Sequence, residues 1–221
     1  KKTKKSIKLK IGSKTITTDL VLVAVGVLAN TDTIGLEKVD VSIENSFIKT
    51  NGYMQTNINN IYAIGDVCGP PLLAHVASAE AIIAVEHICN VENLEKMNYD
   101  NIPGCTYCEP EVASVGLTES KAKDLGYDLK IGKFPFRALG KSLADGNHDG
   151  FVKIIYDAKY GELLGCHIIG NNASNLISEV SISRTLETTY NEILSTVHPH
   201  PTLSEAIQEA TADAFDEAIH L

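Results

Sequence analysis

The chain has 221 residues, of which 44% are hydrophobic and 21% charged, an ordinary balance for a globular protein that can hold one large domain or parts of two or three. Its 28 acidic against 19 basic side chains give a net charge of -9, which argues against nucleic acid as the main partner. No apolar run reaches membrane-spanning length, no signal-peptide pattern opens the chain, and the five cysteines are scattered, which fits a reducing compartment.

The chain opens on a basic run, Lys1 to Lys5, that leads directly into an alternating pattern over residues 6–11. Alternation predicts a half-buried strand, and the turn at 12–14 lets residues 15–17 return as the second strand of a hairpin. The basic run is either a binding patch or the solvated side of this hairpin. Because the first residue is not Met, we expect the chain to be a piece of a longer protein.

Residues 19–26 read D-L-V-L-V-A-V-G, a nearly continuous apolar run. Such a run predicts a strand of a parallel sheet that is covered on both faces. Gly26 ends the run, at the edge where such sheets bind ligands, although Gly also ends many strands that bind nothing.

A second motif, T-N-I-N-N-I-Y-A-I-G-D-V, covers residues 56–67. It predicts a strand over 61–64 that runs into Gly65 and Asp66. Gly65 lets the backbone approach a ligand closely, and Asp66 can accept hydrogen bonds from sugar-like hydroxyls. A strand ending in Gly-Asp can also be a simple turn. The following P-P-L-L-A-H leads into a predicted helix over about 76–89.

Residues 90–101 are polar and typical of a linker, and from 102 onward the pattern indicates an α+β unit. Cys105 and Cys108 form a lone C-x-x-C without a second pair, which disfavours a zinc site, and their spacing on a strand disfavours a disulfide. The remaining predicted elements are strands at 129–136, 151–156 and 162–169, a polar loop at 137–149, a helix capped by Thr118, an amphipathic helix at 173–188 with Leu176, Val180, Ser183 and Leu186 on one stripe, a capping box from Thr189 to Glu192, and a final helix at 204–219.

The segment T-V-H-P-H-P-T-L-S-E-A covers residues 196–206. Each Pro holds the preceding residue, His198 or His200, in an extended conformation. Thr202 can cap the final helix, with Glu205 reaching back in a capping box. The same carboxylate could instead hold one ring nitrogen of a histidine and leave the other free to move a proton. From the residues alone, a capping carboxylate beside a turn and a His–Glu proton relay both stay open.

The run H-x-H-P-T-L-S-E closely resembles the C-terminal signature of the dihydrolipoamide dehydrogenases, a family of FAD-dependent disulfide reductases. The resemblance implies that His200 is the acid–base residue beside the redox sulfurs, that Glu205 orients it, and that the His200–Pro201 bond is cis. Leu203 and Ala206 favour this family over relatives that reduce glutathione disulfide.

The 56–67 motif resembles the second FAD fingerprint of the same flavoproteins, which implies that Asp66 holds the ribityl chain with Gly65 beside it. Gly26 would lie against the nicotinamide cofactor, but G-V-L-A-N-T replaces the G-R-x-P-N-T of the family, so no Arg contact is implied. Four residues would lie at the flavin ring, over a helix N-terminus: Leu72, Leu73, Ala74 and His75. The run A-H-V-A-S-A-E most resembles the plastid and cyanobacterial branch, which favours a plastid over a mitochondrion, or the cytoplasm if the source is bacterial.

Two parts that such an enzyme needs do not occur in this sequence: a G-x-G-x-x-G loop for the FAD pyrophosphate and a C-x-x-x-x-C redox pair. The resemblance therefore implies the C-terminal half of the family's protein. The expected fold is an α+β interface or dimerisation domain, residues 98–221, preceded by C-terminal pieces of two α/β domains. These pieces are the end of the NAD-binding domain, residues 1–50, and a returning segment of the FAD-binding domain, residues 51–97.

The implied reaction is oxidation of dihydrolipoamide to lipoamide with FAD and a redox disulfide, and reduction of NAD+ to NADH. The family pairs two subunits, so that the His–Glu pair of one faces the flavin and sulfurs of the other. Expected partners are a second copy and the lipoyl domains of a 2-oxoacid dehydrogenase complex such as the pyruvate dehydrogenase complex; no metal, membrane or nucleic acid is expected. The fragment alone should be inactive. The alternatives are a related disulfide or metal-ion reductase, or a fragment that serves only as a homodimerisation module.

Overall fold

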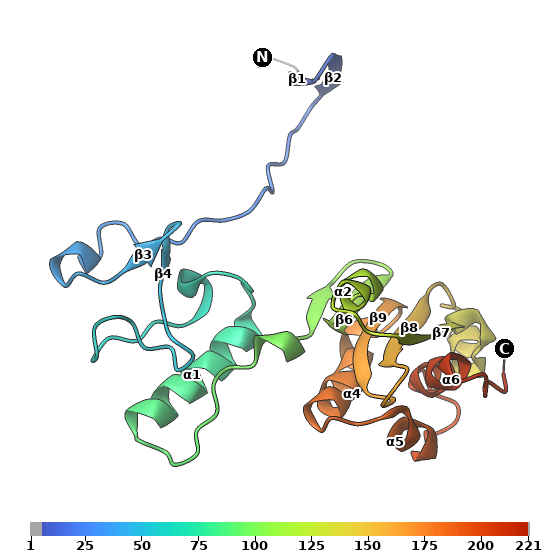
Figure 1. The fold of residues 1–221 in the computed structure, drawn as a ribbon. Coiled ribbons are helices and arrows are strands. Elements are labelled where there is room, and N and C mark those ends of the chain that lie inside the picture. Colours follow the sequence, from blue (N-terminus) through green and yellow to red (C-terminus); the bar gives the residue numbers. More distant parts are fainter. Residues whose placement is uncertain (1–5, 221) are drawn as a thin grey trace. The chain divides into compact units, whose positions relative to one another are not determined.

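The computed structural model describes residues 6–220, and the chain divides into two compact units, Lys1–Met97 and Asn98–Leu221 (Figure 1). The division lies within the polar segment 90–101. The basic run Lys1 to Lys5 lies outside the described residues, so its two interpretations stay predictions. Among residues 6–220, no helix combines the length and the apolar character that a membrane crossing requires.

The first unit opens with the predicted hairpin. Strands β1 (Ile7–Ile11) and β2 (Lys14–Thr18) pair antiparallel, and Gly12 adopts φ +57° in the turn between them. The strand expected over 19–26 is absent, and its side chains lie in solvent, with Leu22 86% and Val25 92% exposed. A central parallel strand takes its hydrogen bonds and its cover from neighbouring elements. The described residues place no strand beside 19–26, so the expectation is wrong for this chain, and an apolar segment stays uncovered.

The rest of the first unit has little sheet. It contains the short helix η1 (Leu36–Lys38), strands β3 (Ile43–Glu44) and β4 (Phe47–Ile48), the short helix η2 (Gly65–Cys68) and helix α1 (Ala74–Ile88). The strand expected over 61–64 is also wrong, because that segment forms one isolated bridge, between Tyr62 and Gln55. A small core of Val41, Ile48 and Ala63 holds the segment in place, and the segment runs into Gly65 and Asp66, which begin the short helix η2. Helix α1 confirms the predicted helix, with a start two residues earlier.

The second unit is built on an antiparallel sheet. Within the described residues its five strands follow the order β5-β6-β9-β8-β7. The strands are β5 (Gly104–Thr106), β6 (Glu111–Gly116), β7 (Leu129–Pro135), β8 (Phe151–Asp157) and β9 (Leu163–Gly170), and the short helix η3 (Tyr99–Asn101) precedes them. The predicted strands and the β8–β9 hairpin are confirmed, because alternating apolar residues and tight turns define them locally.

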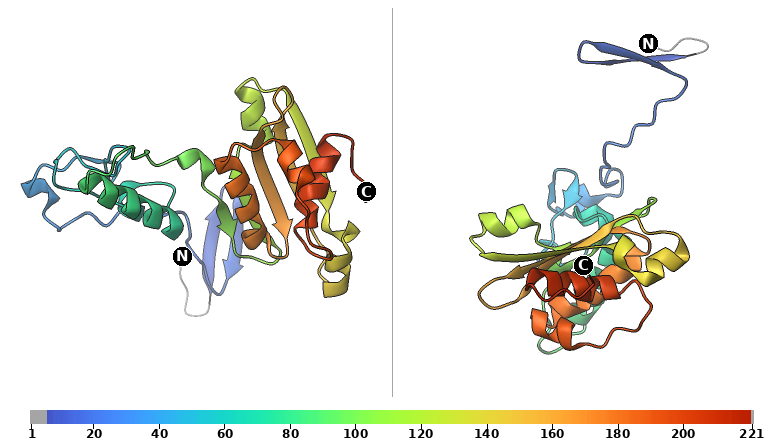
Figure 2. Two further views of the ribbon diagram at one scale, coloured as in Figure 1. Left: turned by 90° about the horizontal axis from the view of Figure 1, so that it is seen from below. Right: turned by 90° about the vertical axis from the view of Figure 1, so that its right-hand side faces the viewer.

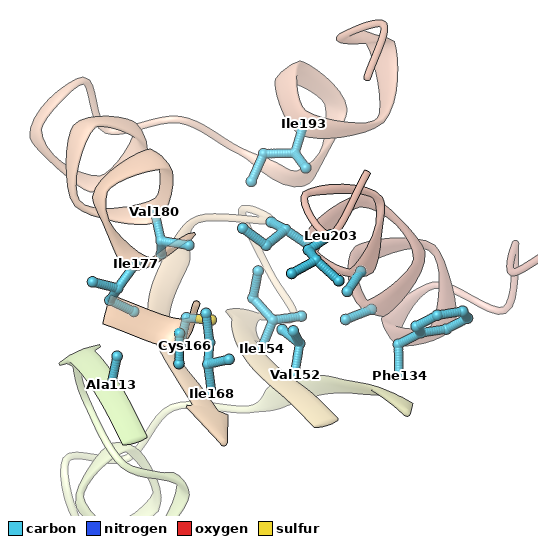
Figure 3. Close-up of a cluster of buried hydrophobic side chains, with 14 of the residues drawn as sticks. Ala113, Phe134, Val152, Ile154, Cys166, Ile168, Ile177, Val180, Ile193 and Leu203 are labelled. Atoms are coloured by element: carbon cyan, nitrogen blue, oxygen red, sulfur yellow. The ribbon is translucent and has the colours of Figure 1, made fainter. Parts of the chain in front are cut away.

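Both faces of this sheet are covered. Helices α4 (Ala173–Thr185) and α6 (Glu205–Ala214) lie on one face, α4 against β6 and β9, and α6 against β7 and β8 (Figure 2). Helix α2 (Glu119–Asp124), capped by Thr118 as predicted, covers the other face through Ala122. Strand β8 shows the alternation, since Ile154 enters the α4/α6 core and Ile155 packs with Ala122. Figure 3 shows the larger core, in which Ile177 and Val180 of α4 meet Cys166 and Ile168 of β9.

Two helix predictions and one loop prediction need correction. The buried stripe of α4 consists of Ala173, Ile177 and Val180, whereas Leu186 of the predicted stripe is 69% exposed. Residues 137–149 are not only a loop, because η4 (Phe136–Ala138) and α3 (Gly140–Asp145) lie there; Gly146, with φ +69°, ends α3. Helix α6 ends at Ala214, five residues before the predicted end at 219, and the chain turns back there.

Candidate functional site

The segment 196–204, here called the His–Pro arm, connects helix α5 (Tyr190–Ser195) to α6. Helix α5 begins with the predicted capping box at Thr189. Its anchor is His198, whose side chain is 4% exposed. His198 Nε2 lies 2.8 Å from Glu179 Oε1 on α4, and its Nδ1 lies 3.1 Å from the carbonyl oxygen of Thr196. The first histidine of the motif therefore fastens the arm to the core.

The second histidine lies in solvent and is held by a carboxylate. His200 Nδ1 lies 2.8 Å from Glu205 Oε1, and the His200 side chain is 75% exposed. Since a carboxylate only accepts hydrogen bonds, Nδ1 carries the hydrogen, and the lone pair of the neutral ring is on Nε2. The His200–Pro201 peptide is cis, as the resemblance implies. The geometry is that of an oriented imidazole with one nitrogen available for proton transfer.

Glu205 also completes the start of α6. Its other oxygen, Oε2, accepts the backbone N–H of Thr202 at 2.8 Å, so the carboxylate does reach back as a capping residue would. The predicted cap by the Thr202 side chain is wrong, because that hydroxyl donates to the carbonyl oxygen of Pro199 at 2.7 Å. The capping and histidine-orienting interpretations therefore coexist, one on each oxygen of Glu205.

Electrostatics keep this carboxylate ionised. Burial raises the pKa of Glu205, but the hydrogen bonds from the Thr202 N–H and from His200 outweigh burial, so its pKa lies below the ordinary value. At neutral pH, Glu205 is therefore an acceptor that fixes the hydrogen on Nδ1 of His200.

The anchor pair predicts a pH-dependent stability. The hydrogen bond to Glu179 raises the pKa of His198 above its ordinary 6.5, against the opposing effect of burial. A histidine whose pKa is higher in the folded than in the unfolded state stabilises the fold fully below the unfolded value, and the stabilisation disappears as pH rises through the folded value. Urea titrations measure the free energy of unfolding of wild type and of His198→Asn. We expect wild type to be the more stable protein below pH 6.5, and this difference to shrink as pH rises above 6.5. An equal slope with pH in both proteins would contradict this; Glu179→Gln should behave like His198→Asn.

The first unit contains the predicted nucleotide residues. Gly65 adopts φ +73° and donates its N–H to Glu80 Oε2 at 2.6 Å, and a Cβ on Gly65 would lie 3.1 Å from Ala77 Cβ on α1. Glu80 is 4% exposed, so a buried carboxylate fixes the turn at Gly65. Asp66, the residue after Gly65, is exposed to solvent. Sequence reasoning missed Glu80, because nothing in the motif distinguishes it from a solvent-facing helix residue.

Helix α1 begins directly after this turn. Leu73 is its N-cap residue and makes no side-chain hydrogen bond to the first turn, and Ala74 and His75 are its first two residues. Helix N-termini present backbone N–H groups and a partial positive charge, which suit an anionic or electron-rich group. The exposed Asp66 carboxylate, the Gly65 turn and this helix start therefore fit a ligand that combines hydroxyls with a ring that takes up negative charge, as FAD does when it is reduced.

Gly26 is not brought to any site by the described residues. It adopts φ +123°, a conformation that suits glycine, but no atom lies within 4 Å of the position that a Cβ would occupy. The contact of Gly26 with a nicotinamide cofactor stays a prediction.

The thiols of this chain form no disulfide bond. All five cysteines are free, and burial raises the pKa of Cys68 to about 11 and that of Cys166 further. A thiolate is the reactive form, so the thiols of Cys68 and Cys166 are poorly suited to disulfide exchange at neutral pH. Within residues 6–220, no group of three or more His, Cys, Asp or Glu side chains could hold a metal ion.

A third His–Glu pair, like that of His198 and Glu179, is not evident from the sequence. His220 Nδ1 lies 2.6 Å from Glu209 Oε1, one helical turn after Glu205. The spacing of Glu205 and Glu209 is visible in the sequence, but the return of His220 to the helix depends on the turn that ends α6.

Comparisons with known proteins cover most of the chain. The family profile described as pyridine nucleotide-disulphide oxidoreductase, dimerisation domain, matches residues 102–211, and the profile described as pyridine nucleotide-disulphide oxidoreductase matches residues 1–81. Dihydrolipoyl dehydrogenase of Zymomonas mobilis is 49% identical over 90% of this chain and 43% of its own length. Dihydrolipoyl dehydrogenase of Bacillus subtilis is 49% identical over 93% of this chain and 43% of its own length.

Solved structures share the fold. LpdA from Mycobacterium tuberculosis matches with a TM-score of 0.84 at 27% identity, over 90% of this chain and 43% of that one. The flavoprotein disulfide reductase RclA from Escherichia coli matches with a TM-score of 0.86 at 20% identity, over 95% of this chain and 48% of that one, which is a likeness of fold. The chain thus spans less than half the length of the relatives it matches.

Proposed function

Because the chain belongs to the pyridine nucleotide-disulphide oxidoreductase family, we propose that it is the C-terminal part of a dihydrolipoyl dehydrogenase. The family is flavin-dependent, and its dihydrolipoyl dehydrogenases use FAD and NAD, as the sequence motifs predict. The reaction of the whole protein would be oxidation of dihydrolipoamide to lipoamide with reduction of NAD+ to NADH. Identity near one half to several dihydrolipoyl dehydrogenases supports this substrate over others.

The observation that carries the proposal is the oriented imidazole of His200. Its Nε2 would take the proton of one dihydrolipoamide thiol, and the resulting thiolate would attack the redox disulfide. Glu205, which holds Nδ1 at 2.8 Å, would stabilise the imidazolium that this step creates. The second thiol would then close the lipoamide disulfide and leave the enzyme cysteines reduced. His200 acts here as a catalytic residue and Glu205 as the residue that orients it.

Residues of the first unit would hold the flavin. Asp66 would accept hydrogen bonds from the ribityl hydroxyls, and Gly65 would let the backbone approach them. Leu72 to His75, at the start of α1, would lie at the flavin ring, where the helix N-terminus favours negative charge. Bound FAD would supply the electron transfer between the redox sulfurs and NAD.

The sulfurs that His200 would serve are not among the cysteines of this chain, and we propose that they lie on the partner subunit of a homodimer. The match of residues 102–211 to a dimerisation domain supports this arrangement. Lipoyl domains of a 2-oxoacid dehydrogenase complex would be the substrate-bearing partners. A plastid, or the cytoplasm for a bacterial source, stays a prediction for the compartment.

Substrate profiles test this proposal. The full-length protein should oxidise dihydrolipoamide with NAD+ far faster than it reduces glutathione disulfide or Cu(II). The 221-residue chain alone should show no turnover, because no two of its cysteines have the C-x-x-x-x-C spacing. Preference of the full-length protein for another disulfide or for a metal ion would replace the proposal with the related-reductase alternative. Turnover by the chain alone would contradict the placement of the sulfurs outside it.

The fragment as a homodimerisation module is the second candidate, favoured by the same match to a dimerisation domain. It predicts that the 221-residue chain pairs on its own, so a monomer in sedimentation of this chain would contradict it.

A further inference from the structure

A small recess of about 60 Å³ lies beside the exposed imidazole of His200. Four ionisable side chains form its polar wall: His200, Glu205, Glu209 and His220. The segment from Ala138 to Gly140 completes the lining and contributes no ionisable group. The recess therefore joins the His200–Glu205 pair to a second pair of the same composition.

The second pair is held by the fold of the last residues. After α6 ends, the Glu217 N–H donates to the carbonyl oxygen of Ala212, so the chain reverses along the helix. Phe215 stacks on Tyr190 with a ring-centroid distance of 3.7 Å, which fastens the reversal to the core. His220 then meets Glu209 twice, through Nδ1 at 2.6 Å and through its backbone N–H at 3.4 Å.

Glu205 and Glu209 lie one turn apart on α6, on the same helix face. Both are largely shielded from solvent, with side chains 18% and 11% exposed. Like charges at this spacing destabilise each other, and shielding from solvent increases the effect. An unpaired Glu209 would add a second negative charge beside the proton that His200 exchanges.

We propose that His220 is a positioning residue of the acid–base site: paired with Glu209, it compensates the second carboxylate, so that His200 responds to the charge of Glu205 alone. This inference rests on the proposed function for its catalytic meaning, but not for its electrostatics. The direction of the pKa values agrees with it, since the hydrogen bond to Glu209 raises the pKa of His220, and the Glu205 charge raises it further.

Other charged groups near the recess are already paired or face away from it. His198 on the arm is bound to Glu179, and on α3 Lys141 pairs with Asp145 at 2.7 Å. On the far end of α6, Asp213 accepts the backbone N–H of Lys133 at 2.7 Å. The remaining charges on the adjoining segments are exposed and do not line the recess: Arg137, Asp216 and Glu217.

Histidine titration by NMR on the 221-residue chain tests the inference without any activity. His200→Gln identifies the His200 signal by its loss. In His220→Gln the titration midpoint of His200 should move up, by roughly half a pH unit, because Glu209 without its cationic partner favours a proton on a nearby ring. Glu209→Gln/His220→Gln removes that charge together with its partner and should return the midpoint to the wild-type value.

His148→Gln is the matched control, because His148 is exposed and lies outside the recess. It should leave the His200 midpoint unchanged. An unchanged midpoint in His220→Gln, or a shift that persists in the double variant, would overturn the inference; the double variant separates charge from any structural effect of losing His220.

The full-length enzyme separates this inference from the proposed function. A neutral His200 is the form that accepts a thiol proton. In His220→Gln the acidic limb of the kcat/KM profile should therefore move to higher pH by the same amount as the NMR midpoint. In the double variant the limb should return to its wild-type position. If the NMR midpoint moves and the limb does not, charge compensation stands and the catalytic role of His200 fails. If neither moves, the inference itself fails.

Discussion

His200→Gln in the full-length protein should lower the turnover of dihydrolipoamide at least about a hundredfold, the lower range of general acid–base catalysis. Gln can accept a hydrogen bond but cannot take up and release a proton at neutral pH. The fold should stay intact in this variant, because the His200 side chain is 75% exposed and makes one side-chain hydrogen bond, to Glu205, so little packing is lost.

Two further variants make this prediction specific. Glu205→Gln should reduce kcat less than His200→Gln, because the amide can still bond to the ring but no longer carries the charge that stabilises the imidazolium. His148→Gln changes an exposed histidine elsewhere in the second unit and should leave kcat unaffected. Near-normal turnover of His200→Gln would remove His200 from the acid–base role.

Gly132→Ala should destabilise the second unit by about 3 kcal/mol or more, the upper range for overpacking a core. Gly132 lies on β7 under α6, and a Cβ on it would lie 1.7 Å from the carbonyl oxygen of Ala210 and 2.7 Å from the backbone nitrogen of Ala214. Both atoms belong to the helix backbone, which cannot move aside as a flexible side chain can. Helix α6 would have to shift from the sheet, and Glu205 and Glu209 would shift with it.

Urea unfolding of the 221-residue chain, followed by circular dichroism, measures this effect. Gly104→Ala on β5 is the matched control, because its Cβ would approach nothing closer than Ser114 Oγ at 4.0 Å. The control should unfold within about 1 kcal/mol of wild type, the usual effect of a Gly→Ala change that meets no clash. Equal unfolding midpoints for Gly132→Ala and wild type would show that α6 does not pack on β7 as described.

The features that the sequence predicted correctly depend on neighbours along the chain. The β1–β2 and β8–β9 hairpins follow from alternation and turn residues, and the Thr118 cap and the box at Thr189 follow from short-range hydrogen bonds. The pairing of His200 with Glu205 belongs to the same class, since five residues separate them and a stiff His–Pro arm limits their positions.

The features that it missed depend on partners distant in sequence. Residues 19–26 have the composition of a buried strand, but a strand exists only beside others, and the described residues place none there. The anchor of His198 is Glu179 on α4, and the partner of Glu209 is His220 beyond the end of α6. Composition and periodicity contain no information on these contacts, because the fold of the whole second unit creates them.

In the proposed mechanism, a histidine of one subunit serves sulfurs of the other. Mixed dimers of the full-length protein test it, with His200→Gln in one subunit and a Cys→Ser change of the redox pair in its partner. The account predicts that two inactive parents regain about one quarter of wild-type activity after subunit exchange, because half of the random dimers are mixed and each mixed dimer has one intact site. No recovery, in dimers shown to have exchanged, would contradict the account.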